Sequence, residues 1–91
     1  MKQVFAVDFD NVLRSNKNRI IVKGREMINK IMDFPNALII IFSARNDTGQ
    51  QYEFVRDFLN KNKVRYHAII LGKVRADLYI DDKAIKFING I

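Results

Sequence analysis

Apolar residues along this chain gather in short continuous runs that are rich in valine, isoleucine and phenylalanine. The first run begins at Val4 and is interrupted by Asp8 and Asp10; the second covers residues 37–42 and the third residues 66–71. Runs of this length are too short to form helices of their own, and they are typical of strands buried on both faces of a parallel sheet. We therefore predict three strands at these places.

Two segments between these runs repeat apolar residues every three or four positions, which predicts two helices. The first helix opens at Gly24 and ends before Pro35, and the second follows Asp47. Their apolar faces consist of Met27, Ile28, Ile31 and Met32 in the first, and of Tyr52, Val55, Phe58 and Leu59 in the second. Asp47 and Gln50 have the spacing of a capping box, so we assign Asp47 to the N-cap of the second helix. The polar stretch of residues 11–23 predicts an exposed loop with a short hairpin.

The last part of the chain predicts a fourth short strand and a final helix. The strand comes just before Asp81 and Asp82, and residues 84–88 fit one or two helical turns with Asp82 as the cap. Strands and helices thus alternate through most of the chain. This order predicts one α/β domain over residues 1–91, with a mostly parallel sheet and helices on both faces.

Composition narrows the chemistry that such a domain can carry. The 91 residues include no cysteine and a single histidine, His67. Disulfides and thiolate metal sites are therefore excluded, and a metal would be bound by oxygen ligands, which favours magnesium over zinc. For His67, which lies before the third strand, we favour a structural surface role over a ligand role.

The formal net charge of +6 suggests an anionic partner. A phosphorylated small molecule is our first choice; a nucleic acid is less favoured, because the basic residues are scattered along the chain. No stretch approaches the roughly 20 apolar residues of a membrane span, and Asp8 interrupts the first run too early for an export signal. We expect a cytoplasmic protein without membrane contact, with a homo-oligomer as one way for so small a domain to gain stability.

Polar residues follow the predicted strands at the ends where parallel strands meet. Asp8 and Asp10 end the first strand, Ser43 ends the second, and the pair Asp81-Asp82 ends the fourth, while Lys73 precedes the fourth strand. Because the carboxyl ends of parallel strands share one edge of the sheet, the strand-end groups can converge. Four acids together repel one another unless a cation lies among them. The alternative, that each acid merely ends a strand or caps a helix, explains each residue singly and their combination poorly.

These residues, in this order, resemble the four signatures of the haloacid dehalogenase superfamily of phosphohydrolases. The matching features are Asp8-Phe9-Asp10 after an apolar strand, Ser43 at a strand end, Lys73, and Asp81-Asp82 after another strand. Residues 72–84 are also similar to small bacterial capsule-biosynthesis phosphatases of the same superfamily. The resemblance covers almost the whole chain and implies a three-layer α/β/α, Rossmann-like fold.

The resemblance implies a Mg²⁺-dependent phosphatase with a role for each matched residue. Asp8 would attack phosphorus to form an aspartyl-phosphate, and Asp10 would act as general acid and base. Mg²⁺ would be held by Asp8, by the backbone carbonyl of Asp10 and by Asp81, with Asp82 as a second ligand or an orienting group. Ser43 and Lys73 would contact the phosphoryl group.

The chain departs from the family pattern in two ways. Asn11-Val12 stand where the family commonly has Gly-Thr, and residues 11–23 leave no room for a cap domain, so the site would be open. The implied substrate is a phosphomonoester such as a sugar phosphate, and we expect Arg45 to contact it. Two alternatives stay open: a phosphatase acting on nucleic-acid ends, and a non-catalytic subunit that binds a metal or a phosphorylated ligand.

Overall fold

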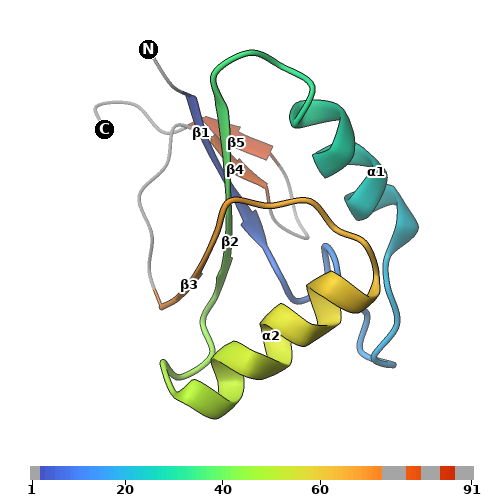
Figure 1. The fold of residues 1–91 in the computed structure, drawn as a ribbon, viewed down its shortest axis with the longest axis vertical. Helices are drawn as coiled ribbons and strands as arrows, with labels where there is room; N and C mark the ends of the chain where they lie inside the picture. The colour runs from blue at the N-terminus through green and yellow to red at the C-terminus, as the bar shows by residue number, and fades with distance from the viewer. Residues whose placement is uncertain (1–2, 73–77, 81–84, 88–91) are drawn as a thin grey trace.

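The computed structural model describes residues 3–72 in full and the backbone of residues 78–80 and 85–87. The elements follow one another as β1 (Gln3–Asp8), α1 (Val22–Ile31), β2 (Ala37–Ser43), α2 (Gly49–Lys61), β3 (Ala68–Leu71), β4 (Leu78–Ile80) and β5 (Ile85–Phe87). The strands form one sheet in the order β3-β2-β1-β4-β5, shown in Figure 1. The protein is thus a small α/β domain, compatible with a Rossmann-like fold.

The sheet is parallel except at one edge. β1 pairs in parallel with β2 and with β4, β2 pairs in parallel with β3, and β5 runs antiparallel to β4. The predicted strands of the first two apolar runs are confirmed, because continuous Val, Ile and Phe residues suit strands that have a neighbour on each side. The third strand is shorter than predicted and begins at Ala68.

Both described helices pack on the same face of the sheet. Each connects a strand to its next neighbour in the same direction, and right-handed crossovers in one direction place their helices on one side. The shared core contains residues from β1, β2 and both helices, among them Phe5, Val7, Ile28, Ile39, Ile41, Val55 and Leu59. On the opposite face, Ala6 is buried among the partly buried Val4, Ile40 and Phe42. The sequence predicts helices on both faces of the sheet, and the two described helices cover one of these faces.

The predicted C-terminal helix is wrong where the structure describes it. Residues 85–87 form β5, whose Ile85 pairs with Ile80 and whose Phe87 pairs with Leu78 of β4. The alternation of Ile85, Lys86 and Phe87 suits a strand, and a helix of one or two turns has too few hydrogen bonds to offset its nucleation. Asp82, the predicted cap of that helix, lies outside the described residues.

The start of each described helix also differs from its prediction. α1 begins at Val22 and therefore runs through Gly24, which is buried because the helix lies against the backbone carbonyl of Val12. In α2 the N-cap is Thr48, whose hydroxyl accepts a hydrogen bond from the backbone N–H of Gln51. The assignment of Asp47 as the cap is wrong.

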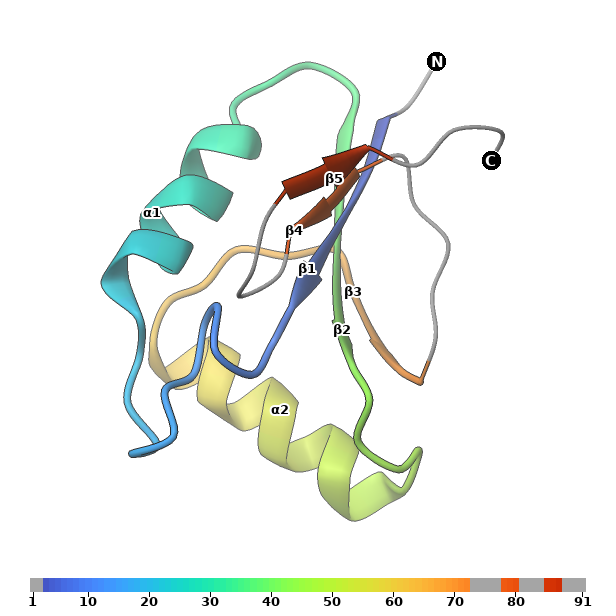
Figure 2. The same cartoon turned by 180° about the vertical axis from the view of Figure 1, so that it is seen from behind.

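The loop between β1 and α1 folds back on itself, as the sequence predicts. The backbone of Arg14 forms two isolated β-bridges, a parallel one with Asp10 and an antiparallel one with Ile20. The backbone N–H of Ser15 donates to the carbonyl of Arg19. Figure 2, the view from behind, shows that this loop lies beside α2. Within residues 3–72 and the two short strands, no helix has the length and apolar character to cross a membrane.

Candidate active site

Asp8 and Asp10 lie where β1 meets the following loop. Asp8 is half-buried and is the last residue of β1, and the next residue, Phe9, is fully buried and donates its backbone N–H to the carbonyl of Phe42 on β2. The carbonyl of Phe9 then accepts from the backbone N–H groups of Leu13 and Arg14. These bonds fold residues 9–14 into a tight turn that presents the side chain of Asp10.

Asn11 lets the chain make this turn. Its φ angle is +69°, in the left-handed region that glycine adopts most easily and that asparagine tolerates better than most other residues. Its backbone N–H donates to the carbonyl of Arg14 at 2.8 Å, which closes the turn. Position 11 therefore has a residue suited to the left-handed backbone conformation that this turn requires.

Ser43 ends β2 next to this turn. Its side chain is only 1% exposed, and its hydroxyl donates to an Asp10 carboxylate oxygen at 3.4 Å while accepting from the backbone N–H of Arg45 at 3.2 Å. The two polar groups that the sequence places at the ends of neighbouring strands thus meet in the structure.

Arg45 holds Asp10 with both arms of its guanidinium group. Its Nε lies 3.1 Å from Oδ2 of Asp10 and its Nη2 lies 3.0 Å from Oδ1, the paired geometry in which arginine binds a carboxylate most strongly. Its third nitrogen, Nη1, donates to the side-chain oxygen of Gln51 in the first turn of α2 at 3.0 Å. Arg45 therefore links the loop after β2 to both the loop after β1 and α2.

Arg14 brings a second guanidinium group to the same carboxylate. Its Nη1 lies 3.3 Å from Oδ1 of Asp10, and its Nε donates to the side-chain oxygen of Asn18 at 2.9 Å. The Arg14 and Arg45 groups also lie over the ring of Phe54, at 5.2 and 5.0 Å from its centre, within the range of cation–π attraction. We call Asp10, Arg14, Ser43 and Arg45, together with Phe54, the Asp10 cluster.

The structure brings together some of the predicted site residues and leaves others untested. Asp10, Ser43 and Arg45 are in contact, and Asp8 lies two residues from Asp10 at the end of the same strand. Lys73, Asp81 and Asp82 lie outside the described residues. Among the residues that are described, no three His, Cys, Asp or Glu side chains gather closely enough to hold a metal ion.

β4 adds one more strand end to the same edge of the sheet. Val7 of β1 is in register with Ile80, the last residue of β4, and the two strands are parallel. Asp8 follows Val7 in the sequence as Asp81 follows Ile80. Three parallel strands, β1, β2 and β4, therefore end at this edge, each directly followed or terminated by a polar residue.

The sequence did not lead us to expect Gln51 or Phe54 in this site, or a contact of Arg14 with Asp10. Arg14 and Asp10 are four residues apart, a spacing that predicts contact within a helix but carries no such prediction in a loop. Phe54 reads from the sequence as an apolar residue of α2, and its position under two arginines depends on how α2 packs. No pattern in the sequence singles these residues out.

His67 has the structural role that we favoured from the sequence. Its Nδ1 accepts the backbone N–H of Ile39 at 2.9 Å, and its own backbone N–H donates to the carbonyl of Ile39 at 3.0 Å. The ring thus continues the pairing of β2 with β3 by one residue. Two pKa shifts occur outside the Asp10 cluster: partial burial raises the pKa of Tyr66, and a hydrogen bond to Asp57 raises the pKa of Arg56.

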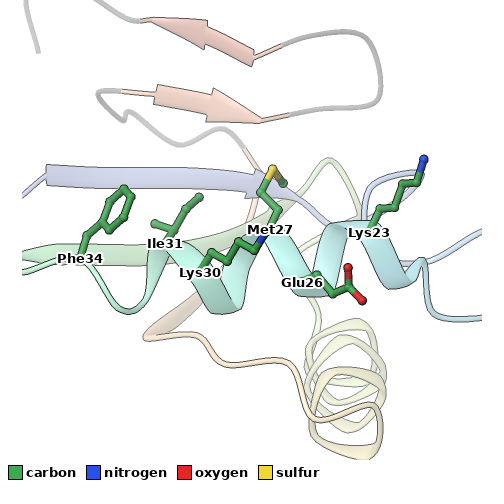
Figure 3. Close-up of a pocket in the computed structure, with 6 residues that line it drawn as sticks. All are labelled: Lys23, Glu26, Met27, Lys30, Ile31 and Phe34. Atoms are coloured by element: carbon green, nitrogen blue, oxygen red, sulfur yellow. The ribbon is translucent and has the colours of Figure 1, made fainter.

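Two cavities in the described part of the protein have no member of the Asp10 cluster in their lining. One, of about 310 Å³, follows α1 from Lys23 to the exposed Phe34, as Figure 3 shows. The other, of about 370 Å³, lies between the loop after β1 and the end of α2, next to Arg19, Phe58 and Lys61. Neither is lined by a predicted site residue.

Comparisons with protein-family models, with curated proteins and with solved structures found no match to this chain.

Proposed function

We propose that this protein is a Mg²⁺-dependent phosphomonoester hydrolase that works through an aspartyl-phosphate on Asp8. The observation that carries the proposal is the contact of Asp10 with Ser43 at the edge where β1, β2 and β4 end. This edge is where open α/β sheets hold their ligands. The residues at the ends of these strands also follow the order on which the resemblance to the haloacid dehalogenase superfamily depends.

Asp8 is the proposed nucleophile. One of its carboxylate oxygens would attack phosphorus and form the acyl-phosphate bond as the bond from phosphorus to the leaving oxygen breaks, and water would then release inorganic phosphate and restore the carboxylate. A carboxylate needs no base to act as a nucleophile at neutral pH. Asp8 stands at the end of a strand that is hydrogen-bonded to neighbours on both sides, so its position is well fixed.

Asp10 is the proposed general acid and base, and the structure adds a condition to that role. Its carboxylate accepts hydrogen bonds from Arg45, Arg14 and Ser43. To give a proton to the leaving oxygen and later take one from water, Asp10 must turn at least one oxygen toward the substrate. We therefore infer that substrate binding loosens one of its arginine contacts.

The available donor set fits Mg²⁺ better than a softer metal. Asp8 and Asp10 offer carboxylate and carbonyl oxygens, and cysteine is absent from the sequence. Asp8, the carbonyl of Asp10 and Asp81 would hold the ion, with Asp82 beside it, and the bound ion would polarise the phosphoryl oxygens. Ser43 would donate to a phosphoryl oxygen, and Lys73 would offset its charge.

We also propose that the complete fold has the three-layer arrangement of that superfamily, without a cap domain. The face of the sheet opposite the two helices carries Val4, Ala6, Ile40 and Phe42, which are apolar and at least partly buried. A second covering layer would have to come from residues outside the described ranges.

The test is hydrolysis of 4-nitrophenyl phosphate with and without Mg²⁺ by the native chain and by Asp8→Asn and Asp10→Asn. We expect activity that requires Mg²⁺ and falls at least about a thousandfold in Asp8→Asn, because loss of a nucleophile removes the covalent path. Asp33→Asn is the matched control, since Asp33 is an exposed acid paired with an exposed Arg65. Full activity in Asp8→Asn would contradict the proposal, and Mg²⁺ binding without turnover of any phosphomonoester would favour the non-catalytic alternative.

A further inference from the structure

The Asp10 cluster contains two guanidinium groups for one carboxylate. Arg14 and Arg45 both form ion pairs with Oδ1 of Asp10, at 3.3 and 3.0 Å, and their side chains are only 20% and 25% exposed. Among the described residues, Asp10 is the carboxylate that pairs with these two arginines. Within the part of the chain that the structure describes, these two guanidinium groups therefore share one carboxylate, and their partial burial favours a further anion beside them.

Both arginines keep N–H groups for a further partner. A guanidinium group has five N–H donors. Within the described part of the chain, Arg14 uses its Nε and Nη1 for Asn18 and Asp10, and Arg45 uses one donor on each nitrogen for Asp10 and Gln51. Arg14 has more unused donors than Arg45, and its Nη2 group is the one best suited to bind an oxyanion.

The two groups are also held in place before any ligand arrives. Phe54 lies under both of them, and the side chains of Asn18 and Gln51 fix one nitrogen of each. Fixed donors lose less side-chain entropy on binding than free ones. The described cluster thus has features that suit an oxyanion: two arginines on one carboxylate, available N–H groups and restricted motion.

Within the Asp10 cluster, Arg14 has no proposed contact with the phosphoryl group on Asp8. Phe5 and Val7 of β1 face the helices, so strand alternation assigns Asp8 to the opposite face with Val4 and Ala6. Arg14 stacks instead on Phe54, a residue of α2 that packs against the core between helices and sheet. One phosphoryl group bound to Asp8 would not account for the orientation of Arg14.

We propose that Arg14, with Arg45, binds a second anionic group of the substrate, separate from the phosphoryl group that is hydrolysed. This inference rests on the proposed function and narrows its substrate class to phosphomonoesters with a second phosphate or carboxylate. Such a pair of anions occurs in small bisphosphates and phosphorylated acids, and also at a phosphorylated nucleic-acid end.

The first experiment compares α,ω-alkanediol bisphosphates of two to six carbons with alkyl monophosphates of the same length. Turnover is followed by phosphate release, and binding to Asp8→Asn is followed by calorimetry in the presence of Mg²⁺, so that the two readouts are independent. We expect kcat/KM and affinity to favour one length of bisphosphate by about tenfold to a hundredfold, the range of one charge-assisted hydrogen bond or ion pair. The preference should appear mainly in KM, because this contact is made equally in the ground and transition states.

Variants of Arg14 decide whether that preference comes from the cluster. Arg14→Met should bring the ratio of bisphosphate to monophosphate close to one, and Arg14→Lys, which keeps the charge but not the planar fork, should keep part of it. Arg65→Met is the matched control, because Arg65 forms a comparable ion pair with Asp33 on the exposed surface, and it should leave the ratio unchanged. Circular dichroism checks that each variant is folded.

The outcomes separate this inference from the proposed function. Turnover without a bisphosphate preference, or a preference that survives in both Arg14 variants, would overturn the second anion site. Arg14-dependent binding of bisphosphates without any turnover would support the anion site and contradict the proposed hydrolysis. A comparison of thymidine 5′-phosphate with the dinucleotide pTpT then tells the two sources apart: an Arg14-dependent gain for pTpT would assign the second anion to a nucleic-acid backbone, and no gain would assign it to a small molecule.

Discussion

Replacing Gly24 with alanine tests how closely α1 must approach the loop that carries Asp10. A Cβ atom added at Gly24 would clash with the backbone oxygen of Val12 and would lie 3.0 Å from its carbonyl carbon. Both of these are backbone atoms, which cannot rotate away as a flexible side chain can. Either α1 or the loop of residues 9–14 must therefore move.

The size of the effect follows from two opposing terms. Forcing an extra carbon into a packed site destabilises a protein by about 1–3 kcal/mol, and a clash with backbone belongs at the upper end. Alanine is a better helix former than glycine by about 1 kcal/mol, which offsets part of this. We expect a net loss of about 2 kcal/mol, which lowers the Tm of a domain of this size by roughly 8–16 °C.

Gly49→Ala is the control, because Gly49 is also a helical glycine but an added Cβ would meet nothing within 4 Å. Urea denaturation followed by circular dichroism gives the free energy of unfolding of the native chain and both variants. We expect Gly49→Ala to be as stable as the native chain, or more stable by less than about 1 kcal/mol. If Gly24→Ala proves as stable as Gly49→Ala, the described contact between α1 and the loop is incorrect.

Three further substitutions test other contacts. Thr48→Ala should lower the free energy of unfolding by about 1 kcal/mol through loss of the α2 cap, and Asp47→Ala should leave it unchanged; an equal loss in both would contradict the assignment of the cap. His67→Ala should destabilise by about 1–3 kcal/mol because the N–H of Ile39 loses its acceptor, and His67→Asn, which supplies an oxygen instead, should restore part of this in the same denaturation assay. Ser43→Ala should lower kcat/KM for 4-nitrophenyl phosphate about tenfold, the value of one hydrogen bond to a charged group, whereas Ser43→Thr, which keeps the hydroxyl, should stay near the native value.

The strands and helices with long, regular patterns were predictable from the sequence. β1 and β2 follow from continuous runs of Val, Ile and Phe, and α2 from an apolar stripe over about two turns. Shorter features were not predictable, because their sequences fit two local structures equally well. Asp47 and Thr48 are both good caps and each is followed three residues later by a glutamine, so the sequence alone cannot choose between them. Residues 85–87 fit a helical turn or a strand equally well until β4 is present to pair with them.

The site was predictable to the extent that it depends on strand ends. Parallel strands share an edge, so the meeting of Asp10 with Ser43 followed from the order of the elements alone. The two arginines depend instead on the turn at Asn11 and on the packing of Phe54, which arise only when the loop and α2 come together. The expected contact of Arg45 with substrate stays a prediction; in the structure its guanidinium group is bonded to Asp10 and Gln51.

The most direct test of the account is the detection of a phosphoryl group on Asp8 during turnover. The native chain is mixed with 4-nitrophenyl phosphate and Mg²⁺, quenched in acid, digested and examined by mass spectrometry. We predict that the peptide containing Asp8 gains the mass of one phosphoryl group, and that Asp10→Asn retains more of it, because the second step then lacks its general base. Turnover without any phosphorylated peptide, or with the phosphoryl group on another residue, would contradict the proposed mechanism.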